Sequence, residues 1–215
     1  MLKCVGICVV PLNSIIWSFL PYFKNRGIRA LHLTASSRAE VCALLRGQQG
    51  SRSEDEPVLI LTHPEELLHP TVLAALRPPP EAVDEAAILR LLLAGSPAPK
   101  SPVGIFVVDE AHIVAMWGHT FRPLYARIGE AVEALRVWPG AALRLVALTA
   151  TASPEERMLV LRLLGFGLHK PVHLLLYSTR RTNTTFRFSA TSARPARSVR
   201  AADVIAHATC TGTPC

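Results

Sequence analysis

The chain has 215 residues, of which half are hydrophobic and 18% are charged. This length and composition suit one α/β domain with a packed core and a tail, and they exclude a wholly disordered chain. The net charge of +7 is concentrated at the end, where residues 171–215 carry six arginines and one aspartate. Such a basic stretch can attract phosphate backbones, although a solvated linker without a specific partner explains it equally well.

The apolar beginning of the chain predicts a strand and a helix. Residues 5–20 are interrupted by Pro11, Asn13 and Ser14, which disfavours a signal peptide or a membrane anchor. None of the five cysteines forms a C-x-x-C pair, so neither a zinc site nor a disulfide framework is supported. We therefore expect an intracellular protein with reduced cysteines and no membrane segment, located in the nucleus if the source is eukaryotic.

Short apolar runs alternate along the chain with helical patterns. The runs suit strands that are covered on both faces, and they lie at residues 5–10, 29–33, 58–61, 105–108, 143–148 and 172–176. Helical patterns lie at residues 14–25, 38–46, 64–76, 125–135 and 154–164. Ser153 before Pro154 predicts a capped start for the last of these helices. This alternation predicts a doubly wound, parallel α/β sheet with flanking helices and right-handed crossovers.

Two segments interrupt the alternation. Residues 77–102 are rich in proline and predict a surface insertion with a short helix at 83–93. From Ser189 onward no periodicity remains, which predicts a disordered tail. Trp17 and Phe19 lie near the start of the first predicted helix, and we interpret them as core residues rather than as base-stacking platforms.

Two adjacent carboxylates follow the apolar run at residues 106–108. Asp109 and Glu110 would lie at the carboxyl end of a parallel strand, where open α/β sheets bind ligands. In nucleotide hydrolysis one such carboxylate holds Mg²⁺ through water, and the other orients the attacking water. Solvated acids at a strand end would explain this pair equally well, so its meaning depends on the residues that follow.

The following residues resemble motifs of the RecQ family of superfamily 2 DNA helicases. Asp109-Glu110-Ala111-His112 leads into Trp117-Gly118-His119-Thr120-Phe121-Arg122-Pro123, which is similar to the aromatic-rich loop of that family. Residues 147–152 resemble its Thr-Ala-Thr motif. Residues 9–16, 61–67 and 181–183 resemble its motif Ia, its motif Ib and its entry into the second motor domain. The resemblance covers residues 5–188 in the family's order, and it implies a RecA-like first motor domain.

The resemblance also implies roles for individual residues. Asp109 would hold the Mg²⁺ of bound ATP, and Glu110 would be the catalytic carboxylate. His112 would link the nucleotide site to Thr149 and Thr151, which would relay the state of the nucleotide toward DNA. Single-stranded or junction DNA would contact a further set of residues, namely Trp117, His119, Phe121, Arg122, Pro11, Asn13, Ser14 and Thr62.

The chain also departs from the family's pattern. Ala115 and Met116 stand where the family has Ser-Gln, and Thr120 replaces an acid. None of the four lysines follows a glycine, so the 215 residues contain no G-x-x-x-x-G-K-[ST] loop for the nucleotide phosphates. We therefore expect a partial ATP-binding domain at residues 1–176, incomplete at its N-terminal end and with open sheet edges. A linker remnant at 177–188 and the disordered tail at 189–215 would follow.

Two functions remain open from the sequence. The first is a fragment of an ATP-dependent 3′–5′ DNA helicase of DNA repair, recombination or replication, unable to unwind DNA alone without the phosphate loop and a second motor domain. The second is a non-catalytic, helicase-derived module that binds DNA or a protein partner. Retention of Asp109 and Glu110 favours the first function, whereas Ala115, Met116 and the missing lysine favour the second.

Overall fold

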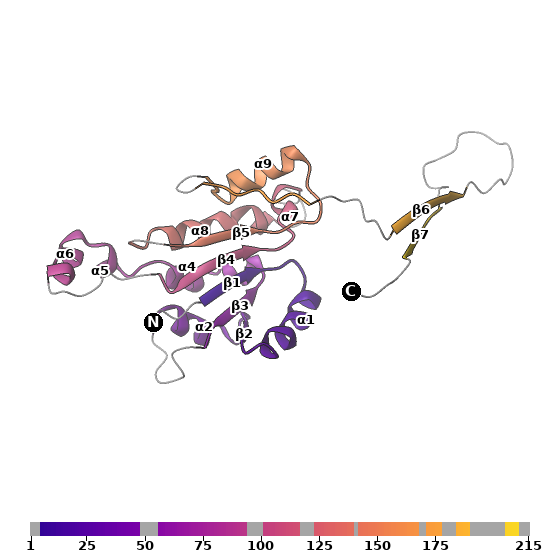
Figure 1. The fold of residues 1–215 in the computed structure, drawn as a ribbon. Helices are drawn as coiled ribbons and strands as arrows, with labels where there is room; N and C mark the ends of the chain where they lie inside the picture. Colours follow the sequence, from indigo (N-terminus) through magenta and orange to yellow (C-terminus); the bar gives the residue numbers. More distant parts are fainter. Residues whose placement is uncertain are drawn as a thin grey trace. The chain divides into compact units, whose positions relative to one another are not determined.

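The structure, a computed structural model, divides the chain into two compact units, Met1–Val172 and His173–Cys215 (Figure 1). It describes residues 5–47, 56–93, 101–116, 123–139, 142–167, 171–177, 184–189 and 205–210.

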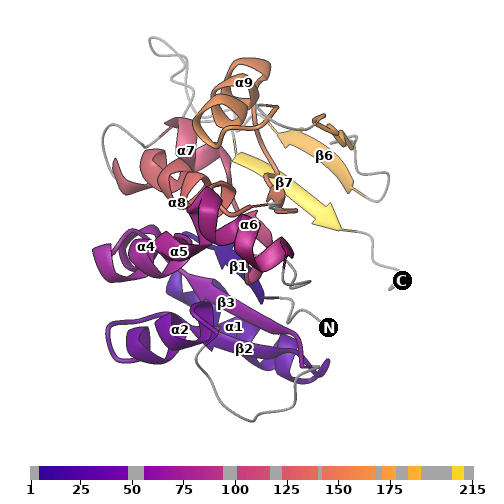
Figure 2. The same cartoon turned by 90° about the vertical axis from the view of Figure 1, so that its left-hand side faces the viewer.

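A parallel sheet forms the centre of the first unit. In the described part of the chain its strands lie in the order β2-β3-β1-β4-β5, and Figure 2 shows β1, β3 and β2 side by side. Their bounds are β1 (Val5–Val9), β2 (Arg29–His32), β3 (Val58–Thr62), β4 (Val103–Val108) and β5 (Arg144–Ala147). The first five predicted strands are thus confirmed to within two residues at each end. The sheet and its flanking helices form the parallel α/β arrangement that we expected.

Helices connect the strands and cover the sheet. The bounds are α1 (Asn13–Lys24), α2 (Arg38–Leu45), α3 (Pro64–Leu67), α4 (Pro70–Leu76), α5 (Pro80–Val83), α6 (Glu85–Leu93), α7 (His112–Met116), the 3-10 helix η1 (Pro123–Arg127), α8 (Ile128–Arg136) and α9 (Pro154–Leu163). The predicted cap of α9 is confirmed, since the Ser153 side chain accepts the Glu156 N–H at 3.1 Å and the Glu156 carboxylate accepts the Ser153 N–H at 2.7 Å. None of the helices that the structure describes is long and apolar enough to cross a bilayer.

The prediction of one continuous helix at residues 64–76 is wrong. The chain forms α3, leaves the helical conformation at His69, where φ is −60° and ψ is 134°, and begins α4 at Pro70. Proline disfavours a helical conformation at the residue before it, but it fits the first position of a new helix. The hydrophobic pattern continues across this break, which is why the pattern alone suggested a single helix.

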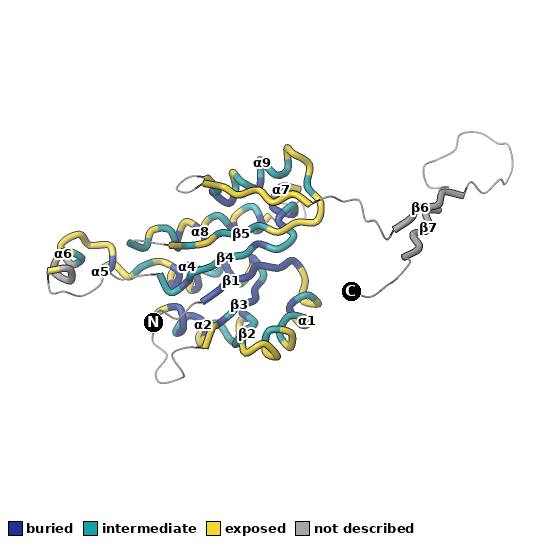
Figure 3. The backbone as a smooth tube through the Cα atoms, in the orientation of Figure 1, coloured by how far each residue is buried: buried dark blue, intermediate teal, exposed yellow. Residues whose placement is uncertain are grey.

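The two faces of the sheet are covered unequally. Alternate residues of a strand point to opposite faces, and Val5, Ile7 and Val9 belong to the larger cluster of buried residues, which includes side chains of α2, α4 and α8. Cys8 and Val10 belong to a smaller cluster with residues of α1 and β3. Figure 3 shows the central strands as the most buried part of the unit and α1 with an exposed outer side.

Trp17 differs from its predicted place in the core. Its side chain is 64% exposed on the outer side of α1. Phe19, by contrast, packs against the smaller cluster, as we expected. The two residues are neighbours in the same apolar stretch, and only the rotation of the helix by about 100° per residue separates them. Helix position therefore decides which of these aromatic side chains reaches the core.

The predicted strand at residues 172–176 is also wrong. Residues 171–177 form no strand or helix, and Leu175 and Tyr177 are more than three quarters exposed. A short apolar run suits a strand only where a neighbouring strand completes its hydrogen bonds, and the described sheet ends at β5.

The second unit contains a pair of antiparallel strands. Thr184 pairs with Cys210 at one end of the pair and Ser189 with Ile205 at the other, in β6 (Thr184–Ser189) and β7 (Ile205–Cys210). The structure therefore differs from the expected tail without regular structure at β7. The β-branched residues Ile205 and Thr209 favour a strand, but a single short segment with two alanines gave too weak a pattern to predict one.

Candidate functional site

The parallel sheet brings most of the candidate residues to one edge. Since all five strands run in the same direction, the segments that follow them leave the sheet at its carboxyl edge. Pro11 follows β1, His63 follows β3, Asp109 follows β4 and Thr149 follows β5. Segments that lie up to 138 positions apart in the chain are thus collected on one side of the sheet.

A tight turn after β4 presents the two carboxylates. The Asp109 N–H donates to the carbonyl of Val9, which continues the pairing of β4 with β1 at 2.9 Å. The Glu110 N–H then donates to the Asp109 carboxylate at 3.0 Å. Glu110 adopts a φ of +49°, a left-handed conformation that is uncommon for a residue other than glycine. Such strained residues concentrate at functional sites, where the surrounding structure holds them in place.

His112 connects the carboxylates to the segment after β5. Its Nδ1 lies 3.3 Å from a carboxylate oxygen of Glu110 and 2.9 Å from the Thr149 hydroxyl. That hydroxyl donates to the carbonyl of Thr151 at 2.8 Å and accepts the Thr151 N–H at 3.3 Å. Because the only proton of the hydroxyl is used toward Thr151, His112 Nδ1 carries the proton of the bond to Thr149. The backbone supports this link, since the Ala111 N–H donates to Leu148 at 2.8 Å.

The residues after β4 fit the metal side of a magnesium–nucleotide site. Mg²⁺ is commonly held by one or two carboxylates together with substrate phosphates and water. Asp109 and Glu110 offer two partly exposed carboxylates of this kind. Within the described residues there is no cluster of three or more side chains that could hold a metal ion by themselves. The loop that binds the nucleotide phosphates in such sites has the form G-x-x-x-x-G-K-[ST], and this motif does not occur in the 215 residues.

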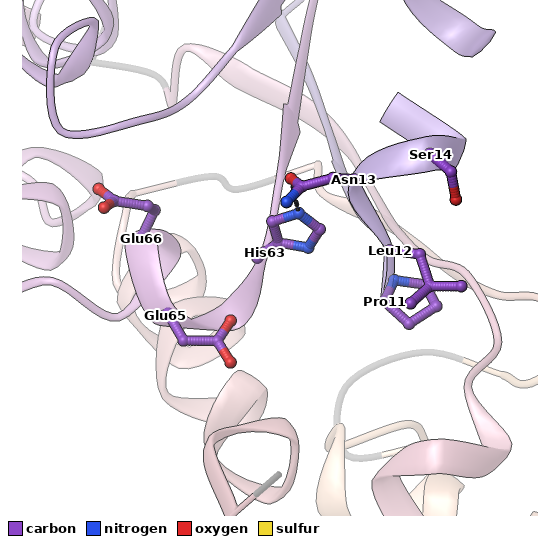
Figure 4. Close-up of a pocket in the computed structure, with 7 residues that line it drawn as sticks. All are labelled: Pro11, Leu12, Asn13, Ser14, His63, Glu65 and Glu66. Atoms are coloured by element: carbon purple, nitrogen blue, oxygen red, sulfur yellow. Dashed lines mark hydrogen bonds between the residues drawn. The ribbon is translucent and has the colours of Figure 1, made fainter. Parts of the chain in front are cut away.

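A pocket lies beside the start of α1. Pro11, Asn13 and Ser14 line it together with Leu12, His63, Glu65 and Glu66 (Figure 4). His63 Nε2 lies 2.7 Å from the side-chain oxygen of Asn13, and its Nδ1 lies 2.7 Å from the carbonyl of Val10. Glu66 is paired with Arg38 at 2.7 Å, which offsets its charge. Three of the four residues predicted for this part of a DNA site therefore lie together.

Thr62, the fourth of these residues, does not line the pocket. Its side chain is fully buried, and its hydroxyl donates to the carbonyl of His63 at 3.0 Å. His63 takes the position that faces Asn13, and the sequence analysis did not single it out. Its place directly after an apolar strand and before Pro64 was the available signal. The expected loop residues Trp117, His119, Phe121 and Arg122 lie outside the described residues.

Sequence comparisons relate the chain to DNA helicases. It is 38% identical over 109 residues to a probable ATP-dependent DNA helicase RecS of Bacillus subtilis. The matched residues make up 50% of this chain and 19% of that protein. It is 30% identical over 167 residues to the ATP-dependent DNA helicase Q-like 4B of Arabidopsis thaliana, covering 76% of this chain and 12% of that protein. It is also 30% identical over 155 residues to the RecQ-like DNA helicase BLM of Xenopus laevis. This match covers 71% of this chain and 10% of that protein.

The chain thus spans less than a fifth of the length of these relatives. No family model matches it. Among solved structures, the helicase domain of Hef from Pyrococcus furiosus is similar over 77% of this chain and 28% of that chain, with a TM-score of 0.42 and 18% identity.

Proposed function

Since this chain is a relative of the RecQ-type ATP-dependent DNA helicases and corresponds to part of their motor, we propose that it couples ATP hydrolysis to single-stranded DNA as a piece of such a motor. The observation that carries this proposal is the row of contacts in which His112 Nδ1 lies 3.3 Å from the Glu110 carboxylate and bonds the Thr149 hydroxyl, which in turn bonds Thr151. This link joins the ends of two adjacent strands, so a change at the carboxylates can reach the segment after β5.

The carboxylates provide the nucleotide side of the proposed function. Bound ATP with Mg²⁺ would supply the phosphoryl group and the charge that polarises it. In our proposal the Asp109 carboxylate holds the metal through water, and the Glu110 carboxylate orients the attacking water. His112 Nδ1, which lies 3.3 Å from the Glu110 carboxylate and bonds the Thr149 hydroxyl, would couple the position of the Glu110 side chain to Thr149.

The DNA side of the proposed function lies at two places. Pro11, Asn13 and Ser14 would contact the DNA backbone at the pocket beside α1, and we assign the place of the buried Thr62 to His63. The aromatic-rich loop would supply stacking and phosphate contacts through Trp117, His119, Phe121 and Arg122. The substrate would be single-stranded DNA or a duplex junction. The protein would act inside the cell, in the nucleus of a eukaryote, in repair, recombination or replication.

A non-catalytic module that binds DNA or a protein is the second candidate. One observation favours it, namely that Ala115 and Met116 stand where the family has Ser-Gln.

The 5′ end of the transcript distinguishes the two candidates. An upstream, in-frame G-x-x-x-x-G-K-[ST] would place Asp109 and Glu110 in a working ATPase. A transcript without this motif would contradict the ATP-driven function and leave the binding module.

The DNA-loop assignment has a separate test. The full chain with Trp117 and Arg122 both changed to alanine should bind a fluorescent oligo-dT markedly more weakly than the wild type. The circular dichroism spectrum should be unchanged. Equal affinity of the two proteins would contradict the assignment.

A further inference from the structure

The outer side of α1 carries a stripe of three groups that suit a nucleic acid strand. Asn13, Trp17 and Lys24 are separated by four and seven residues, so at about 100° per residue they lie within about 40° of one another around the helix. All three are exposed. An amide at the pocket, an aromatic ring and a cation thus follow one another along a single helix face.

Trp17 contacts a second aromatic ring although most of its side chain is exposed. Its ring meets the ring of His32 edge to face, with centroids 5.7 Å apart and planes at 85°. His32 in turn meets His63 at 6.2 Å and 82°. His63 contacts Asn13 at the pocket. A continuous row of rings therefore connects the exposed indole to the pocket that we assign to the DNA backbone.

The ring beneath Trp17 belongs to His32. Burial, followed by the nearby His63, lowers the pKa of His32, which favours the neutral form of the ring that supports Trp17. An indole held by a neutral ring offers a flat apolar surface. Such a surface suits stacking with a base, whose aromatic face is common to all four nucleotides.

The charges along α1 itself suit a polyanion, whereas the pocket at its start is lined by Glu65 and by Glu66, which is paired with Arg38. The first acidic residue of the whole chain is Glu40, and it is paired with Arg29 at 2.7 Å. Among the described residues, Lys24 at the end of α1 forms no ion pair, so its charge remains available to phosphates, whereas the Arg26 guanidinium lies 3.6 Å from the centroid of the Tyr22 ring. A protein partner with an acidic surface would be attracted too, but the exposed aromatic ring between the pocket and Lys24 favours a strand with bases.

We propose that Trp17 stacks on a base of single-stranded DNA whose backbone enters the pocket at Asn13 and runs along α1 toward Lys24. This inference rests on the proposed function, since it requires that the chain binds single-stranded DNA. It extends the binding site from the carboxyl edge of the sheet to the outer side of α1, and it gives a role to a residue whose surroundings in the fold do not require a large aromatic side chain.

Two probes of equal length test the proposal with the full chain. One is a fluorescent oligo-dT, and the other is an abasic oligomer with the same phosphates and no bases. Trp17→Ala should bind oligo-dT about tenfold more weakly than the wild type, which lies within the range measured for one stacked base. Binding of the abasic oligomer should be unchanged. Trp17→Phe should retain most of the affinity for oligo-dT.

Tyr22→Ala is the matched control. Tyr22 is an aromatic residue of the same helix with 49% exposure, but it lies about 140° away from Trp17 around the helix. Its removal should leave the affinity for both probes unchanged.

The outcomes that overturn the inference differ from those that overturn the proposed function. Wild-type affinity of Trp17→Ala for oligo-dT, or an equal loss on both probes, would exclude base stacking by Trp17 while DNA binding itself stands. A wild-type chain that binds neither probe would refute the DNA side of the proposed function and the inference with it.

Discussion

Thr149 connects the turn after β4, which carries His112, with the segment after β5, which carries Thr151. Its hydroxyl accepts from His112 and donates to Thr151, whereas Thr151 takes part in this network through its backbone N–H and carbonyl. The same substitution at the two threonines should therefore have different effects, because only one of them removes the shared hydroxyl.

Replacement of Thr149 by valine should lower the free energy of unfolding by about 0.5–1.5 kcal/mol, the ordinary net contribution of a hydrogen bond. Urea unfolding monitored by circular dichroism measures this change. Thr151→Val keeps the backbone partners and should cost clearly less. Equal losses for both variants would contradict the role of the Thr149 hydroxyl in this link.

The buried thiol of Cys8 makes the stability of the chain depend on pH in the alkaline range. Burial and then the charge of Asp109 raise the pKa of the Cys8 thiol from 9.0 to about 12. The folded chain therefore holds this proton more tightly than the unfolded chain does. The resulting stabilisation is complete below pH 9 and is lost as the pH rises toward 12, by at most about 1.4 kcal/mol per pH unit.

Cys8→Ala removes the titrating thiol and should alter the pH dependence. The wild type should lose stability relative to this variant as the pH rises above 9, while the difference between them stays constant from pH 7 to pH 8.5. Urea titrations at these pH values give the two free energies of unfolding. A constant difference up to pH 10.5 would show that the thiol titrates normally in the folded chain.

Single residues differ in how well the sequence predicts them. Asp109, Glu110 and His112 were found because a motif fixes their order, and local backbone bonds then bring them together with Thr149. His63 and Trp17 carry no such motif. Their positions depend on the rotation of α1 and on the end of β3, which are properties of tertiary packing. Thr62 was misplaced for the same reason, since a shift of one residue along a strand turns a side chain to the opposite face.

At the scale of elements, α9 follows directly on the Thr149 segment, and its start is fixed by a capping box. Ser153 and Glu156 bond each other's backbone N–H, which satisfies two donors at the helix terminus. Ser153→Ala should lower the free energy of unfolding by about 1 kcal/mol. Ser153→Asp keeps an acceptor at the cap and should preserve stability in the same urea titration. A loss as large for aspartate as for alanine would contradict the capping role.

The sequence predicted a helix or strand well where neighbouring residues alone determine it. The cap before Pro154 and the five apolar strands needed no knowledge of distant residues. The break at His69 was missed because the apolar pattern continues through it, although Pro70 was visible in the sequence. Residues 172–176 have the composition of a strand, yet pairing with a neighbour decides whether a strand forms, and composition cannot supply that neighbour.

At the scale of the whole molecule, charge is distributed unevenly between the two units. Residues 171–215 carry six arginines against one aspartate, whereas residues 1–170 are nearly balanced. Under the proposed function two kinds of contact contribute to DNA affinity. Basic residues release counterions from the phosphates and make affinity depend on salt, whereas stacking depends on salt far less. The salt dependence of binding therefore separates the contribution of the basic stretch from that of the aromatic residues.

Changing Arg194, Arg197 and Arg200 together to glutamine should reduce the slope of log affinity against log salt for oligo-dT by up to about 2, since each lost phosphate contact on a single strand contributes about 0.7. Fluorescence anisotropy from 50 to 300 mM salt, roughly the range in which such slopes are resolved, measures this change. The matched control changes the exposed Arg127, Arg144 and Arg162 instead, which lowers the net charge equally but outside the basic stretch. A similar reduction in both triple variants would mean that only net charge attracts the DNA, whereas an unchanged slope in the first variant would mean that the stretch is a solvated linker.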